Sequence, residues 1–167
     1  TEIYTLSLHD ALPIFNTVFD TINSLIGVIL GLYFSEASES SIYMLSIIST
    51  AIALGISSGS STYEAEYLEQ LGLIKEIERH LLTSFEKSES LLLRNAKKKG
   101  IVVGLANLLT PIIIALSCVL FIALISDLDI AIVGSIVLLG SILFTAGVFF
   151  GKMNQLNPLR KIGRAHV

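Results

Sequence analysis

The distribution of charge constrains this sequence more than any other feature. One segment, residues 63–99, carries seven of the eleven Lys and Arg residues and seven of the fourteen Asp and Glu residues. Long apolar runs lie on both sides of it. The chain is 53% hydrophobic and 15% charged, whereas a soluble domain carries about a quarter charged residues. Charge collected in one block of an otherwise apolar chain is typical of a polytopic membrane protein.

The two ends of the sequence resemble translated sequencing-library adapters. Residues 1–14 (TEIYTLSLHDALPI) match the adapter used at one end of a library fragment, and residues 162–167 (IGRAHV) match the one at the other end. Both segments are therefore set aside in fold reasoning, as added tags would be. The native segment is expected to run from 15 to 161, truncated at both ends, and His80 is then its one histidine.

Four apolar runs each have roughly the 20 residues that a transmembrane helix needs. They predict an all-α, polytopic membrane bundle with spans at 14–34, 42–62, 100–126 and 130–150. The spans form two hairpins, 15–62 and 100–150. A charged helical segment, 63–99, connects the hairpins, and Gly72 is expected to bend or break it. Residues 151–161 are expected to begin a linker to a further span.

Small residues and one proline predict how the spans pack. The second span has a serine-rich face that includes Ser57, and Gly55 and Gly59 lie roughly opposite. Two faces of small residues favour a helix that packs on both sides. Pro111 in the third span removes one backbone hydrogen bond and is expected to kink that helix.

The basic residues predict the orientation. Residues 63–99 and the segment after residue 150 contain the Lys and Arg residues of the native part, and the turns at 35–41 and 127–129 contain acidic residues only. Cytoplasmic loops carry an excess of Lys and Arg. Residues 63–99 are therefore expected in the cytoplasm and the two acidic turns on the outer side of the membrane.

The sequence lacks the residue patterns that indicate an enzyme. One Cys and, between residues 15 and 161, one His give no nucleophile–base pair, and no P-loop or dinucleotide-binding fingerprint is present. We therefore expect no enzymatic activity, no permanently bound cofactor and no nucleic-acid partner. The remaining candidates for function are polar side chains in or beside the spans.

The first candidate is Asp20, inside the first apolar run. A carboxylate within the membrane is costly and marks a functional site by default. Asn16, Asn23, Gly27 and Gly31 share its helix face, which predicts contact with protein or a water-filled path and a close helix approach at the two glycines. The alternative is that Asp20 lies near the cytoplasmic interface and simply reaches water there.

The second candidate is one face of the charged segment. If that segment is a continuous helix, Glu66, Glu69, Glu76 and His80 fall within a sector of about 80°. Carboxylates together with one imidazole suit Mn²⁺ or Fe²⁺. The alternative is an ordinary solvated helix face.

Three segments carry a family resemblance: FDTINSLIGVILGLYF, ISTAIALGISSGSSTYEAEYLEQL and KEIERHLL. They are similar to the VIT/CCC-type vacuolar iron transporter family, and most similar to its short archaeal and bacterial members, over residues 15 to 160. The resemblance implies five membrane helices, the fifth being lost here, and a homodimer in a prokaryotic cytoplasmic membrane. It also implies transport of Fe²⁺ or Mn²⁺ out of the cytosol.

Within this resemblance, Asp20 matches the pathway aspartate, and Thr21 stands where the family has glycine. The family motif Ile-Ser-Met-x-x-Gly-Glu-Tyr corresponds to residues 56–63, with Ser58 at the methionine position and Thr62 at the glutamate position. The expected transport pathway comprises Asp20, Asn23, Ser57, Ser58 and Thr62. The expected metal ligands are Asp20, Glu66, Glu69, Glu76 and His80.

The sequence thus predicts a divalent-metal transporter whose cytosolic glutamates collect the ion and whose Asp20 passes it onward. Because Ser58 and Thr62 replace metal ligands, the alternative is a membrane scaffold or regulatory protein that keeps the fold without transport. A carrier of a small organic solute is a third possibility, and it would have a polar cavity that is not centred on Asp20.

Overall fold

The computed structural model describes residues 8–81 and 89–155, and all regular structure in these ranges is helical. Four α-helices follow one another: α1 (Leu8–Phe34), α2 (Ser40–Leu81), α3 (Glu89–Leu124) and α4 (Leu128–Gln155). The all-helical architecture predicted from the apolar runs is confirmed. α1 begins within the segment 1–14, so residues 8–14 continue the first apolar helix toward its N-terminus.

Each helix contains a stretch long and apolar enough to cross a membrane. The four stretches are Leu12–Phe34, Ser40–Glu76, Lys97–Leu124 and Leu128–Lys152. Only 17% to 33% of the most apolar window of each stretch is buried inside the protein. Large apolar side chains such as Leu45, Val102 and Phe144 therefore lie on the outside. An apolar exterior around a helical bundle is what a lipid environment requires.

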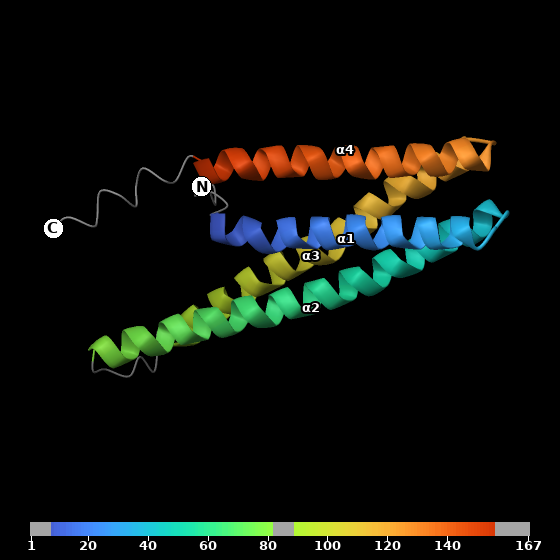
Figure 1. Ribbon diagram of the computed structural model, residues 1–167. Coiled ribbons are helices and arrows are strands. Elements are labelled where there is room, and N and C mark those ends of the chain that lie inside the picture. The colour runs from blue at the N-terminus through green and yellow to red at the C-terminus, as the bar shows by residue number, and fades with distance from the viewer. Residues whose placement is uncertain (1–7, 82–88, 156–167) are drawn as a thin grey trace.

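The helices form a bundle from which one hairpin projects (Figure 1). α1 and α3 each contact all the other helices, and α2 and α4 lie on opposite sides of them. The α1–α2 and α3–α4 turns lie together at one end. α2 and α3 run side by side and extend past the rest of the bundle at the other end. At that end, the rings of Phe15 and Phe150 stack with centroids 4.5 Å apart and join the start of α1 to α4.

The described parts of the charged segment, residues 63–81 of α2 and 89–99 of α3, lie in the two arms of this projecting hairpin. α2 continues without interruption through Gly72 to Leu81, so of the predicted bend or break at Gly72 the break is wrong. A glycine inside a helix costs about 1 kcal/mol relative to alanine. The Leu, Gln, Ile, Glu and Lys residues around Gly72 are good helix formers and offset that cost. α3 likewise passes through Pro111 as one helix.

Glycines bring α2 and α3 into backbone contact. A Cβ atom on Gly55 would lie 2.6 Å from the carbonyl oxygen of Leu108, and one on Gly104 would lie 2.9 Å from the carbonyl oxygen of Gly59. Either distance is too short for a side chain. The glycine face of the second span therefore packs as predicted, whereas Ser57 on the other face is exposed.

The close approach predicted at Gly27 and Gly31 is absent from the described part of the chain. A Cβ atom on either glycine would meet nothing within 4 Å. α1 instead buries the opposite face, with Ile22, Leu25 and Ile29, in the hydrophobic core. The polar and small face of α1 is consequently left on the surface of the protein.

Candidate functional site

A cleft between α1 and α2 brings together four of the five predicted pathway residues. Its volume is about 270 Å³. Asp20 lies on the α1 side, and Ser57, Ser58 and Thr62 lie on the α2 side. The other lining residues are Pro13, Asn16, Thr17, Thr21, Leu54 and Ser61. A single carboxylate thus faces a group of hydroxyls between two membrane-length helices.

Asp20 is exposed, and it accepts a hydrogen bond from a residue of its own helix. The side-chain amide of Asn16 donates to Oδ2 of Asp20 over 3.4 Å, one helical turn away. A long, exposed hydrogen bond of this kind is weak. The carboxylate therefore keeps most of its capacity to accept hydrogen bonds or to coordinate a cation. The fifth predicted pathway residue, Asn23, is exposed on α1 and does not line the cleft.

Several hydroxyl groups of the cleft donate hydrogen bonds to backbone carbonyls. Thr21 donates to the carbonyl oxygen of Thr17 over 2.6 Å, and Ser61 donates to that of Ser58 over 3.1 Å. Ser58 itself donates to the backbone oxygen of Asn107 over 3.2 Å. A hydroxyl whose proton is used in this way still has oxygen lone pairs. The cleft can therefore present oxygen atoms to a cation.

Asn107 on α3 supports the α2 side of the cleft from behind. It is 0% exposed, and its amide Nδ2 donates to Oγ1 of Thr62 over 2.8 Å. Its Oδ1 is buried and has no hydrogen-bond partner in the described part of the chain. The sequence analysis missed this residue. A polar side chain within an apolar run was the signal that selected Asp20, and the same signal applies to Asn107.

Glu66, a predicted metal ligand, is engaged in contacts between helices. Its side chain is 8% exposed, and Oε1 lies 2.7 Å from Nζ of Lys99, which is 42% exposed. Gln70 also donates to Oε1 of Glu66 over 3.0 Å. The ion pair with Lys99 joins α2 to α3 at the base of the projecting hairpin, whereas the Gln70 contact lies within α2. Glu66 and Lys99 therefore form a structural ion pair within the chain.

The other predicted ligands lie farther along the same helix. Glu69 and Glu76 are exposed on α2. His80 belongs to α2, but its side chain lies outside the described part of the structure. Among the described residues, no three His, Cys, Asp or Glu side chains gather closely enough to hold a metal ion. The predicted glutamates thus lie on one helix, α2. The described residues of one chain do not form a metal centre there.

In comparisons with known proteins, no family model, no curated protein and no solved structure matches the chain. The resemblance to vacuolar iron transporters therefore stays a prediction from the sequence.

Proposed function

We propose that the protein is a membrane carrier of divalent cations and that the α1–α2 cleft is part of the ion path. The observation that carries the proposal is that Asp20 shares one cleft with Ser58 and Thr62. A carboxylate inside a membrane-length helix is costly, so its presence there indicates a function. The cleft places hydroxyl oxygens opposite that carboxylate, where they can replace part of the water around a passing ion.

The composition of the cleft favours a hard cation. The potential ligands are carboxylate, hydroxyl and amide oxygens, and sulfur is absent from the lining residues. Oxygen ligands suit Mn²⁺ better than they suit softer metals. Of the two ions that the family resemblance suggests, Mn²⁺ is the better match for these residues, with Fe²⁺ as the second substrate.

We infer that two copies of the chain pair through α1. Asn16, Asp20, Asn23, Gly27 and Gly31 form an exposed stripe along this helix, and neither glycine has a neighbour where a Cβ would be. A polar stripe is expensive to leave facing lipid, and glycines spaced by four residues allow close helix contact. A symmetric pairing would cover both stripes and bring two Asp20 carboxylates toward one path.

The proposal can be tested in vesicles that contain the purified protein and a trapped dye quenched by Mn²⁺. The wild type should admit Mn²⁺ faster than protein-free vesicles do, and Asp20→Asn should lose most of that flux. Glu39→Gln is the matched control, because it removes a carboxylate from an exposed turn outside the cleft.

A second candidate function is a membrane scaffold of the same fold. It is favoured by the pairing of Glu66 with Lys99, since this carboxylate is then unavailable to collect ions. A scaffold would form the same α1 dimer, and its Mn²⁺ entry would equal that of protein-free vesicles. Mn²⁺ flux separates the two functions, and cross-linking of Asn23→Cys chains tests the α1 dimer that both of them share.

A further inference from the structure

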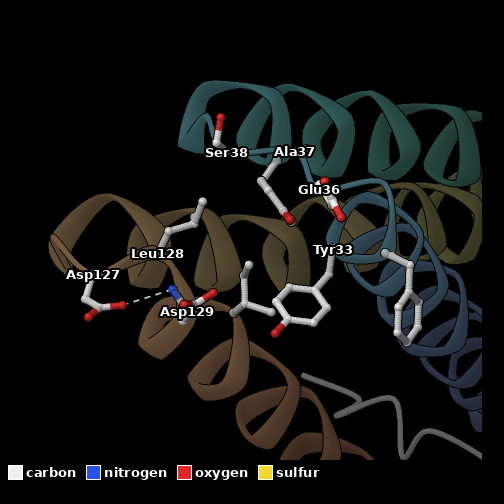
Figure 2. Close-up of a pocket in the computed structure, with 10 residues that line it drawn as sticks. Tyr33, Glu36, Ala37, Ser38, Asp127, Leu128 and Asp129 are labelled. Atoms are coloured by element: carbon white, nitrogen blue, oxygen red, sulfur yellow. Dashed lines mark hydrogen bonds between the residues drawn. The ribbon is translucent and has the colours of Figure 1, made fainter.

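A second cleft lies where the two turns meet, at the end of the bundle opposite the projecting hairpin in Figure 1, and Figure 2 shows it in close-up. It is formed where α1 turns into α2 and where α3 turns into α4, and its volume is about 650 Å³. It shares no lining residue with the Asp20 cleft. The residues that carry the inference are Tyr33, Glu36, Tyr43, Asp127 and Asp129.

The cleft has a negative lining. Glu36 belongs to the α1–α2 turn, Asp127 to the α3–α4 turn and Asp129 to the start of α4. Among the described residues, no Lys or Arg lines the cleft. Asp127 also caps α4, because its Oδ1 accepts the backbone N–H groups of Asp129 over 3.0 Å and Ile130 over 3.2 Å. Carboxylates held in a cleft with partly apolar walls raise the local concentration of cations.

Tyr43 supplies an independent indication of a ligand. Its side chain lines the cleft and is 0% exposed, and its hydroxyl has no hydrogen-bond partner in the described part of the chain. Buried polar groups in folded proteins are nearly always hydrogen-bonded, so an unpartnered one calls for an explanation. A ligand that enters with an N–H donor would supply a partner for the acceptor lone pairs of the phenol oxygen.

The lining is that of a site for an organic cation. Among the described residues, no three acidic, Cys or His side chains lie close enough together to hold a metal ion. The cleft is also lined by the aromatic and aliphatic side chains of Tyr33, Phe34 and Ile132. Figure 2 shows the Tyr33 ring extending from α1 toward the start of α4. Aromatic faces attract ammonium groups. Clefts of several hundred Å³ are the usual size for small organic ligands.

The backbone at Glu36 fits a functional role for this carboxylate. Glu36 has a φ of 57°, and the backbone N–H groups of Glu36 and Ala37 bond the carbonyls of Tyr33 and Leu32, respectively. This is the Schellman end of a helix, where glycine is the usual residue. A glutamate at that position keeps a carboxylate at the cleft where glycine would be the less strained choice.

We propose that this cleft binds an organic ammonium cation with N–H donors. Glu36 and Asp129 balance its charge, Tyr33 packs against it, and the Tyr43 hydroxyl oxygen accepts one of its N–H groups. The site does not depend on ion passage beside Asp20, and binding can be measured without transport. The same ammonium chemistry occurs in a free polyamine and in the ethanolamine headgroup of a lipid.

The test is calorimetric titration of the full chain, held in phosphatidylcholine nanodiscs, with putrescine. Saturable binding to the wild type is expected. Asp129→Asn and Tyr43→Phe should each weaken it about tenfold, because each removes a partner of a charged group. Glu39→Gln should bind like the wild type, since Glu39 lies beside the same turn and does not line the cleft. Thermal unfolding of each variant checks the fold, and Glu36→Gln replaces any variant that does not fold.

Absence of saturable putrescine binding to the wild type would overturn the proposal. So would equal affinity in the wild type, Asp129→Asn and Tyr43→Phe. Saturable binding that all three cleft variants weaken supports it, and repeating the titration in phosphatidylethanolamine nanodiscs then identifies the source. A lower putrescine affinity in that lipid indicates that the headgroup occupies the cleft, whereas an equal affinity indicates a soluble amine.

Discussion

The side-chain amide of Asn107 on α3 donates a 2.8 Å hydrogen bond to the hydroxyl of Thr62 on α2. Thr62 lines the cleft that contains Asp20, and Asn107 is fully buried behind it. The third helix thus fixes the orientation of a side chain in the proposed ion path. Hydrogen bonds between membrane helices contribute about 0.6 kcal/mol on average and up to about 1.7 kcal/mol.

A double-mutant cycle measures this contact. Asn107→Ala should lower the free energy of unfolding in detergent by about 1–3 kcal/mol, because it removes a buried hydrogen bond and leaves a cavity. Thr62→Val should cost less, and the double variant should be more stable than the sum of the two losses implies. Strictly additive losses would show that the two side chains do not interact.

The backbone contact between α2 and α3 predicts a position-specific effect of small substitutions. Gly104→Ala places a Cβ against the carbonyl oxygen of Gly59 and should destabilise the protein by about 1–3 kcal/mol. Gly140→Ala on α4 is the matched control, because a Cβ there meets nothing within 4 Å. The control should be neutral or stabilising by up to about 1 kcal/mol, since alanine favours helix. Equal unfolding temperatures for both variants would contradict the packing.

Removal of the ion pair between Glu66 and Lys99 should destabilise the protein at the base of the hairpin. Lys99→Ala leaves the carboxylate of Glu66 buried with Gln70 as its described hydrogen-bond donor. Because Lys99 is itself 42% exposed, the expected cost is modest, about 1 kcal/mol. Lys98→Ala, at the exposed neighbouring position, should cost less. Thermal unfolding of the two variants compares them, and a greater loss in Lys98→Ala would argue against the pair.

Replacement of Glu36 by glycine should raise the stability of the protein and weaken putrescine binding. Glu36→Gly relieves a left-handed backbone conformation and should stabilise the protein by up to about 1 kcal/mol. The same change removes a carboxylate from the cleft between the turns, so putrescine affinity should fall. Chemical unfolding and calorimetry on one preparation measure both effects. A variant that is less stable than the wild type would show that the carboxylate supports the fold.

The sequence was sufficient to predict the four helices, because each apolar run is long enough to form one and the charge lies between them. It was not sufficient for the charged segment. Residues 63–99 were expected as one helical segment that Gly72 would bend or break, yet their described parts form the end of α2 and the start of α3. Good helix formers on both sides of Gly72 outweigh one glycine, and that balance is difficult to predict from local sequence.

The candidate site was predicted in part. Four candidate residues on two different helices lie in one cleft in the structure: Asp20 on α1, and Ser57, Ser58 and Thr62 on α2. Two contacts between α2 and α3 could not be predicted: Asn107 with Thr62, and Lys99 with Glu66. Their positions depend on how α3 is aligned along α2, and backbone contacts at Gly55, Gly59 and Gly104 set that alignment.

The measurement that tests the central proposal most directly is Mn²⁺ entry into vesicles that contain wild type or Asp20→Asn protein at equal density. Asparagine keeps the shape of the side chain and removes its charge, so folding and dimer formation should be unchanged. We predict that Asp20→Asn lowers the protein-dependent rate at least about tenfold, which corresponds to about 1.4 kcal/mol, while Glu39→Gln leaves the rate unchanged. Equal rates for wild type and Asp20→Asn would contradict a role of Asp20 in ion passage.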